Sequence, residues 1–495
     1  MISVPRARVS WAMLTALTVS GAAGAESRPP APAARAAAGL DRGLELLQEG
    51  EHTEAAAALY GALSASRLGD GRHERVQFHL ARALRELGLH LAADELLAAV
   101  IGNRTVPELV PSALGLLLED LERGRADEWF VQSVLLDMDV GTLAGEHADA
   151  VAYHQGLQDL RQGQLRWGET GFRAVSGARY VHRTALALGA FHLTRGDVET
   201  ARRSFRRVAD AKEAPAEVRS LAVLSLARLA ADGGLAKGER ATLEEARDLY
   251  AKVGRPYAVS ADVLLERAWL DFQLGDPRRA LGFLLALDAP DYRDRLLPDK
   301  YVLRALIYSH ACHYRAARQA ALQLPRDFAA VADAVQRRQD ARQSAALRRV
   351  LAKEPAVAPL EDLRGRIVAQ RAAFGDVEDH PKLTRWLEGV YARLLDDVDR
   401  RLGAAQAEAL PDIGRALIDA VADLRVVNFE LALKLHRRVR GETVARSERL
   451  GAAPPIPWGG DKVFFPFEGE SAADYEFWAD ELSDLVVYLE DRCVE

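Results

Sequence analysis

The stretch from residue 183 to residue 208 has the pattern of two antiparallel helices joined by a tight turn, and it restricts the fold more than any other segment. Gly196 and Asp197 mark the turn between the two helices. Apolar residues recur at every third or fourth position along the second helix: Val198, Ala201, Phe205 and Val208. A single hairpin of this kind cannot bury its own apolar face, so the pattern predicts neighbouring hairpins.

The same pattern recurs before and after this stretch. A small residue lies seven positions before each turn and another lies five after it, with larger apolar residues nine and twelve after it. Small residues suit the places where two helices approach closely, and large ones fill the gap to the next hairpin. The hairpin at Gly124 fits less well, because Trp129 occupies a small position, and residues 232–240 resemble an inserted loop. The turns fall at Gly50, Gly88, Gly124, Gly163, Gly196, Ala241, Gly275 and Cys312.

These hairpins resemble the tetratricopeptide (TPR) repeat, and their spacing scatters around its period of roughly 34 residues. The resemblance covers roughly residues 36–325. In that family the first helix of each repeat lines a concave groove that holds segments of partner proteins. The resemblance implies these groove residues: Arg75, Phe78, Arg82, Arg85, Tyr153, Arg161, Arg183, Trp269, Phe272 and Gln273. The competing interpretation is that some of the aromatic residues among them belong to the core between repeats.

Beyond residue 325 the pattern changes to longer amphipathic segments. We predict helices over 327–353, 360–374 and 383–402, and a fourth that opens near Pro411. The predicted fold is therefore all-α, a TPR-like α-solenoid followed by long helices. Its parts are a signal peptide over residues 1–25, a flexible tether over 26–38, the solenoid over 39–325, coiled-coil-like helices over 326–444, and an aromatic tail with a terminal helix over 445–495.

The fourth of these helices carries a seam of apolar residues that must face another helix. Leucines recur at steps of seven, with further apolar residues between them: Leu410, Ile413, Leu417, Ala420, Leu424, Val427 and Leu431. One interpretation packs the third and fourth helices as an antiparallel hairpin within the chain. The other is a homodimeric coiled coil through residues 410–431.

The tail differs in composition from the rest of the chain. Prolines at its start lead into Trp458, Phe464, Phe465 and Phe467, and a terminal helix is expected from about Ala473. Aromatic residues exposed in such number would be costly in water. They either pack back on the scaffold or form a docking segment for another protein.

The N-terminus has the features of a Sec-type signal peptide. Arg6 and Arg8 precede an apolar segment, and Ala23-Gly24-Ala25 provides a cleavage site; the alternative is an uncleaved membrane anchor. We expect no other membrane span. Cys312 and Cys493 would then lie in an oxidising compartment, where a bridge between them is chemically permitted.

No catalytic motif accompanies these features. The sequence lacks the glycine-rich phosphate loops, the nucleophile elbow and the paired-histidine zinc motif. The cluster from His310 to His313 is too compact to surround a tetrahedral ion by itself. A net charge of -7 argues against nucleic acid as the main ligand. We therefore expect no enzyme activity, no cofactor and no metal.

These observations favour a periplasmic or outer-membrane-associated scaffold that binds other envelope proteins or peptide segments. The FFPFEGE segment, the motif from Trp478 to Leu482 and the terminal cysteine resemble the tail of exported TPR subunits of myxobacterial gliding-motility machinery. The alternatives are a generic adaptor for secretion or outer-membrane assembly, and an enzyme, or its regulator, that acts on the cell wall.

Overall fold

The computed structural model describes residues 32–143, 145–374, 379–440, 462–464, 482 and 485–493. Within them the protein is all-α apart from one short pair of strands, as the sequence predicts. The expected signal peptide over residues 1–25, and Trp458, Phe465, Phe467 and Trp478 of the aromatic tail, lie outside the described residues.

Helices α1 to α16 follow one another as antiparallel hairpins, which is compatible with a helical-repeat solenoid. Short 3-10 turns precede or follow several of them: η1 (Pro107–Leu109), η2 (Val140–Thr142), η3 (Tyr257–Val259) and η4 (Pro290–Tyr292). The hairpins are α1 (Pro32–Glu49) with α2 (His52–Ala65), α3 (Gly71–Glu86) with α4 (His90–Asn103), α5 (Val110–Glu122) with α6 (Glu128–Leu136), α7 (Gly145–Arg161) with α8 (Leu165–Arg173), α9 (Ala178–Thr194) with α10 (Val198–Asp210), α11 (Ala216–Lys237) with α12 (Arg240–Tyr250), α13 (Ala261–Gln273) with α14 (Pro277–Ala286), and α15 (Pro298–His310) with α16 (Tyr314–Asp327).

The turns of the hairpins are confirmed by their backbone conformation. The turn glycines from Gly50 to Gly275 have positive φ, where a side chain would be strained. Cys312 stands at the same place in the last hairpin and also has a positive φ, of 59°. The sixth turn is at Gly238 (φ 67°) rather than at Ala241, because α11 continues through the expected loop to Lys237.

In three hairpins the small residue before the turn faces the large residue nine positions after that turn. A Cβ added at Gly189 would lie 2.6 Å from the Phe205 ring, and one added at Gly156 would lie 2.6 Å from the Phe172 ring. Gly43 faces Leu59 in the same way. The spacing read from the sequence therefore corresponds to direct packing between the two helices of a hairpin.

The solenoid begins earlier than the sequence predicts. The expected tether extended to residue 38, whereas α1 begins at Pro32. The segment after Pro32 is rich in alanine, the strongest helix former, and proline is well tolerated in the first turn of a helix.

The first of the predicted long helices is also wrong in extent. The single helix expected over 327–353 is two short ones, α17 (Ala329–Gln336) and α18 (Ala345–Leu351). Arg338 has a positive φ after α17, and the Ser344 hydroxyl accepts a hydrogen bond from the Leu347 amide at the start of α18. Helix α19 (Ala358–Ala372) follows, close to its expected position.

The predicted third and fourth helices form one helix of 59 residues, α20 (Pro381–Val439), so they do not fold back as a hairpin. Pro411 lies inside it. The seam of residues 410–431 is covered by the chain itself: Ile413, Leu417 and Leu424 are buried in a cluster with residues of α15 to α18. The same seam is therefore not free to form a homodimer.

The end of the chain contains the one sheet that the described residues form. Strands β1 (Lys462–Phe464) and β2 (Leu485–Val487) pair in parallel, with Val463 opposite Val486. The expected terminal helix is therefore wrong at residues 485–487, which pack against α14. All three β2 residues are buried, and a short run buried on every side fits a strand as well as a helix.

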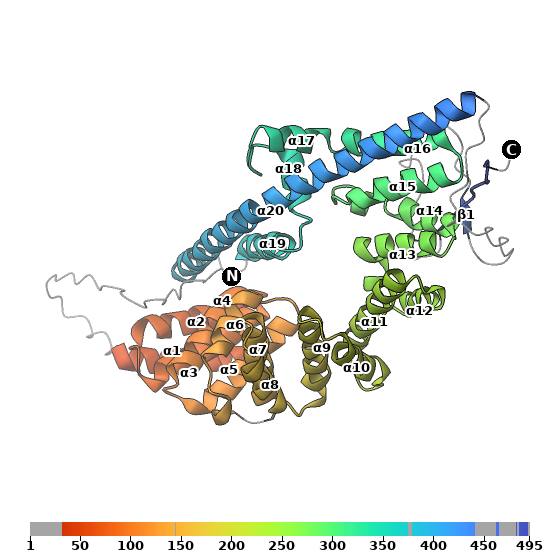
Figure 1. The fold of residues 1–495 in the computed structure, drawn as a ribbon. Coiled ribbons are helices and arrows are strands. Elements are labelled where there is room, and N and C mark those ends of the chain that lie inside the picture. The colour runs from red at the N-terminus through yellow and green to blue at the C-terminus, as the bar shows by residue number, and fades with distance from the viewer. Residues whose placement is uncertain are drawn as a thin grey trace.

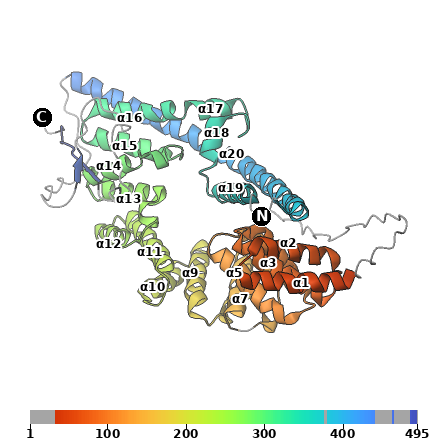
Figure 2. The same ribbon diagram turned by 180° about the vertical axis from the view of Figure 1, so that it is seen from behind.

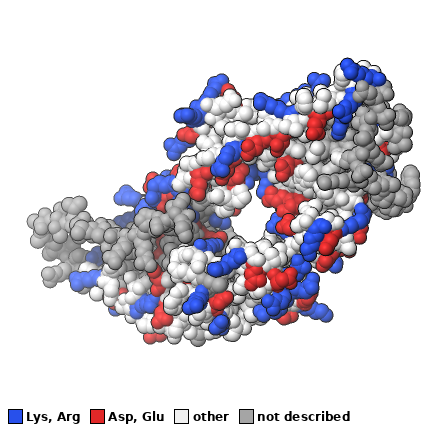
Figure 3. Space-filling view, in the orientation of Figure 1, with Lys and Arg blue, Asp and Glu red and all other residues white. Residues whose placement is uncertain are grey.

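The elements form a closed ring. In Figures 1 and 2 the hairpins follow a curved path from α1 to α16, and α20 crosses from the last hairpins back to the first. The N-terminal half of α20 contacts α2 and α4, whereas its C-terminal half contacts α15 to α18. Figure 3 shows an opening through the centre, with acidic and basic side chains interspersed around it.

Candidate interaction surfaces of the ring

The residues that the TPR resemblance implies fall into three separate groups along the ring. The first is on α3, where Arg75 and Arg82 are exposed. Phe78 is buried in the core, with 8% of its surface exposed. Arg85 is engaged within the chain, since its guanidinium donates to Asp120 (2.9 and 3.1 Å) and to Glu119 (2.8 Å). Of this group, only Arg75 and Arg82 can offer charge to a partner.

Asp120 is the centre of a buried charge cluster that the sequence did not reveal. Its side chain is fully buried and lies within 3.2 Å of His90 and 3.0 Å of Arg125, in addition to Arg85. Burial alone would raise the pKa of Asp120, but hydrogen bonds from His90 and Arg85 outweigh it and lower the pKa. Burial, followed by the nearby Asp120 charge, holds the pKa of Asp94 well above its usual value. This cluster joins α3, α4 and α5 and has a structural role.

The second group joins α7 and α9 through aromatic contacts. The Tyr153 ring lies 6.0 Å from the Phe172 ring and 5.4 Å from the Tyr180 ring, between centroids. The Arg183 guanidinium lies over Tyr180, 5.9 Å from its centroid. Burial raises the pKa of the Tyr153 hydroxyl, and the charges of Arg183 and Arg161 oppose that shift. Tyr153 and Arg183 are partly exposed, so here an aromatic surface and a cation lie together at the edge of the core.

Arg161 belongs to the same region but points toward the preceding hairpin. It is exposed, and its guanidinium donates to the Gln132 amide oxygen at 3.3 Å. Trp167 on α8 is 68% exposed and was not among the predicted residues. Trp167 lies outside the positions that define the repeat pattern. A large aromatic residue at such a position could have been recognised from the sequence as a candidate surface residue.

The third group lies on α13, beside the C-terminal tail. Trp269 and Phe272 have ring centroids 6.4 Å apart, and Phe272 lies 5.4 Å from the His310 ring. Both residues pack against the cluster that includes Leu485 of β2. Gln273 is exposed. The chain's own tail therefore shares this part of the surface.

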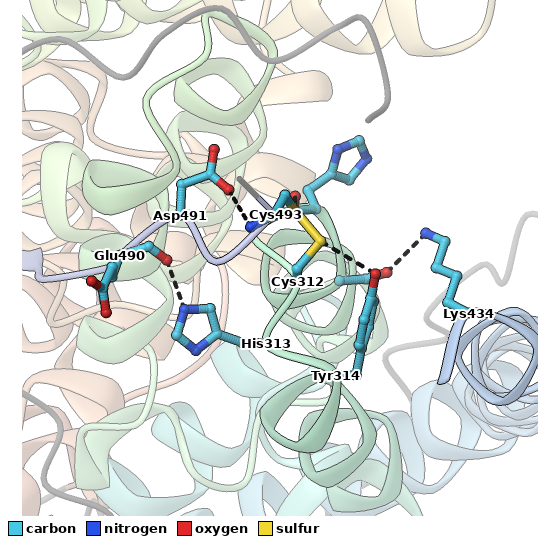
Figure 4. Close-up of a disulfide and its surroundings, with 9 residues drawn as sticks. Cys312, His313, Tyr314, Lys434, Glu490, Asp491 and Cys493 are labelled. Atoms are coloured by element: carbon cyan, nitrogen blue, oxygen red, sulfur yellow. Dashed lines mark hydrogen bonds between the residues drawn. A yellow bond between two sulfur atoms is a disulfide. The ribbon is translucent and has the colours of Figure 1, made fainter. Parts of the chain in front are cut away.

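A disulfide joins Cys312 to Cys493, with Cα atoms 5.2 Å apart and a sequence separation of 181. Figure 4 shows hydrogen bonds around the bridge. The His313 Nε2 atom bonds to the Glu490 carbonyl oxygen (2.7 Å), and the Lys434 ammonium group donates to the Ser309 hydroxyl (3.1 Å). The bridge fixes the tail to the turn of the last hairpin.

The same bridge removes the sequence cluster at His310 to His313 as a metal site, because the Cys312 sulfur is not available as a thiolate. Within the residues that the structure describes, no group of three or more His, Cys, Asp or Glu side chains could hold a metal ion. No helix in those residues is both long and apolar enough to cross a bilayer.

Sequence reasoning missed the contact that closes the ring. The Arg401 guanidinium of α20 donates to both carboxylate oxygens of Asp127 (2.5 and 3.2 Å) and lies 5.0 Å from the Trp129 ring centroid. Arg366 of α19 donates to the carbonyl oxygens of Gly124 and Ala126. The hairpin at Gly124, which fitted the repeat pattern poorly, therefore receives polar contacts from both C-terminal helices.

Apolar and polar contacts extend this closing surface onto α2 and α4. The Tyr60 and Trp386 rings stack with centroids 5.3 Å apart. The Gln370 side-chain oxygen accepts hydrogen bonds from the Leu91 amide (3.1 Å) and the Tyr391 hydroxyl (2.7 Å). Tyr391 is fully buried, so the contact is part of the core.

No protein-family model and no curated protein matches this sequence.

Proposed function

We propose that the protein is a non-enzymatic scaffold that holds segments of other exported proteins and assembles them into a cell-envelope complex. The observation that carries this proposal is the group of Tyr153, Tyr180 and Arg183: Tyr153 and Arg183 are partly exposed, and each lies within 6 Å of the buried Tyr180 ring. Tyrosine and arginine dominate the binding energy of many protein interfaces, because they combine contact area with oriented hydrogen bonds. The TPR resemblance supports the same function.

The proposed location is the periplasm or the periplasmic side of the outer membrane. The disulfide between Cys312 and Cys493 supports it, because such bridges persist in oxidising compartments. The expected signal peptide agrees with export. Gliding motility is one envelope machine that such a subunit would serve, and a secretion or outer-membrane assembly complex is another.

The test is crosslinking in the native cell followed by affinity purification of the full chain. Arg183→Glu should abolish recovery of the partner, because it places a carboxylate over the Tyr180 ring. Arg203→Glu is the matched control, because Arg203 is exposed on α10 and its guanidinium donates a hydrogen bond to the Thr200 hydroxyl of the same helix. Circular dichroism of both variants checks that the helices are retained.

Envelope proteins recovered with the wild type and with Arg203→Glu, but not with Arg183→Glu, would support the proposal. Recovery of the same proteins with Arg183→Glu would overturn the assignment of the surface. Turnover of peptidoglycan by the purified protein would overturn the non-enzymatic function.

A further inference from the structure

The C-terminal half of α20 has a second apolar face, opposite to the one that is buried. We define the outer stripe as Ile418, Ala422, Val426, Phe429 and Leu433. Their spacing of three and four residues places them on one side of a helix with 3.6 residues per turn, over about 22 Å of its length. Large parts of these side chains are exposed: 68% of Ile418, 59% of Val426, 66% of Phe429 and 45% of Leu433.

The outer stripe is turned away from α15 to α18, the helices that the buried face of α20 contacts. The buried residues between Ile413 and Leu431 pack on α15 to α18 and, at 100° per residue, lie on the other side of the helix. Figure 1 shows α20 lying across those helices, and Ile418, Val426 and Phe429 each keep more than half of their surface exposed. A continuous apolar stripe on a charged surface marks an interaction site.

We propose that the outer stripe binds the same stripe of a second copy of this protein, with the two α20 helices antiparallel. An isologous contact requires a surface that is complementary to itself. With a two-fold axis between residues 425 and 426, Ile418 lies level with Leu433 of the second copy, and Ala422 lies level with Phe429 of the second copy. The smallest residue of the stripe therefore meets the largest at both ends at once.

Charges beside the stripe favour the antiparallel orientation. Asp412 and Asp419 flank its Ile418 end, where Arg415 is paired with Asp412, whereas Arg437 and Arg440 flank its Leu433 end, and all five are exposed. The Ile418 end is therefore acidic by one charge among these residues. Antiparallel helices bring the acidic end of one copy to the basic end of the other. Parallel helices would place like charges together, which is unfavourable along a helix pair.

The contact is small. A stripe of four helical turns buries less than the roughly 1,600 Å² of a standard interface, so we expect a dissociation constant in the micromolar range. The inference goes beyond the scaffold function and does not depend on it, because the stripe shares no residue with the Tyr153 group.

The test is sedimentation velocity of the full, disulfide-bonded chain across low to high micromolar concentrations. The wild type should pass from monomer to dimer as the concentration rises. Phe429→Asp should remain monomeric, because it buries a carboxylate beside Ala422 of the second copy. Val368→Asp is the matched control, since Val368 is an apolar residue of α19 that is 46% exposed and far from the stripe in sequence. It should dimerise as the wild type does.

Orientation is tested by single added cysteines. An equimolar mixture of Ile418→Cys and Leu433→Cys chains should form a mixed disulfide under mild oxidation, whereas Ile418→Cys alone should not crosslink to itself. A wild type that stays monomeric, a dimer that survives Phe429→Asp, or efficient self-crosslinking of Ile418→Cys would each overturn the proposal.

Discussion

Glycines inside these helices differ in what surrounds them, and this decides the effect of adding a methyl group. We expect Gly189→Ala to destabilise the protein by about 1–3 kcal/mol, because the new Cβ would lie 2.6 Å from the Phe205 ring. Gly403→Ala in α20 is the matched control: nothing lies within 4 Å of its Cβ position. That change should stabilise the helix by about 0.5–1 kcal/mol. Urea midpoints that shift in the same direction for both variants would contradict the packing described here.

Asp271 carries a carboxyl group in a place that disfavours its charge. It is 2% exposed, and its Oδ1 atom has no hydrogen-bond partner among the described residues. Burial raises its pKa to about 7, with Asp276 adding to the shift and Arg279, Arg267 and Arg247 opposing it. The folded protein therefore keeps a proton that the unfolded chain releases near pH 4.

Stability should consequently fall between pH 4 and pH 7, because over that range the native state binds more protons than the unfolded state. Asp271→Asn keeps the shape of the protonated acid and removes this loss. We expect the variant to match the wild type near pH 4 and to be more stable at pH 8, by at most about 4 kcal/mol. Urea titrations of both proteins at the two pH values measure it, and equal stability at pH 8 would refute the assignment.

Single residues also mark the limit of what the sequence could predict. Gly196 and Cys312 were placed in turns correctly, because a hairpin needs a left-handed residue at a fixed distance from its apolar positions. Arg85 was placed on a binding surface, since its helical position resembles that of a groove residue. Its carboxylate partners, Glu119 and Asp120, belong to the next hairpin, and a repeat pattern does not contain that information.

At the scale of elements, β2 depends on a residue of another element. A Cβ at Gly282 of α14 would collide with the Leu485 carbonyl, so β2 can lie on α14 only where no side chain intervenes. We expect Gly282→Val to release β2 without unfolding α14. Hydrogen exchange of the amides of residues 485–487, followed by mass spectrometry, should become faster. Gly365→Val is the control, because nothing lies within 4 Å of that position; equal exchange in the two variants would contradict this prediction.

The elements that the sequence misjudged have recognisable physical reasons. The third and fourth helices were separated at Pro411, yet residues 404–409 between them are mostly alanine, glutamine and glutamate, which favour helix. The apolar residues Leu482, Leu485, Val486 and Leu489 follow helical spacing, and pairing with β1 and docking on α14 override it for β2. Local patterns predicted the hairpins, and contacts distant in sequence decided the rest.

At the scale of the whole molecule, α20 belongs to two hydrophobic clusters at once. Leu387 and Tyr391 are buried with residues of the first hairpins, whereas Leu417 and Leu424 are buried with residues of the last. The part between them, from Gly403 to Glu408, has no fully buried residue. Closure of the ring therefore depends on the contacts of the N-terminal half of α20, in which Leu387 is buried.

We expect Leu387→Asp to open the ring, because it buries a charge in that contact and costs several kcal/mol there. The hairpins should persist, since each packs mainly on its neighbours. Small-angle X-ray scattering should report a larger radius of gyration, with unchanged helical content by circular dichroism. Glu388→Asp, at an exposed position one residue away, is the control; a variant as compact as that control would show that other contacts hold the ring closed.

An open solenoid behaves as a spring, because its hairpins touch only their neighbours and small rotations accumulate along the stack. A rigid rod fastened at both ends of such a spring turns it into a frame. Tension applied to one side of this protein would divide between two load paths, one through the hairpins and one through α20, and the packing of α20 on α15 to α18 attaches the end of the second path to the first. Objects bound at different points of the frame would keep a fixed separation under load.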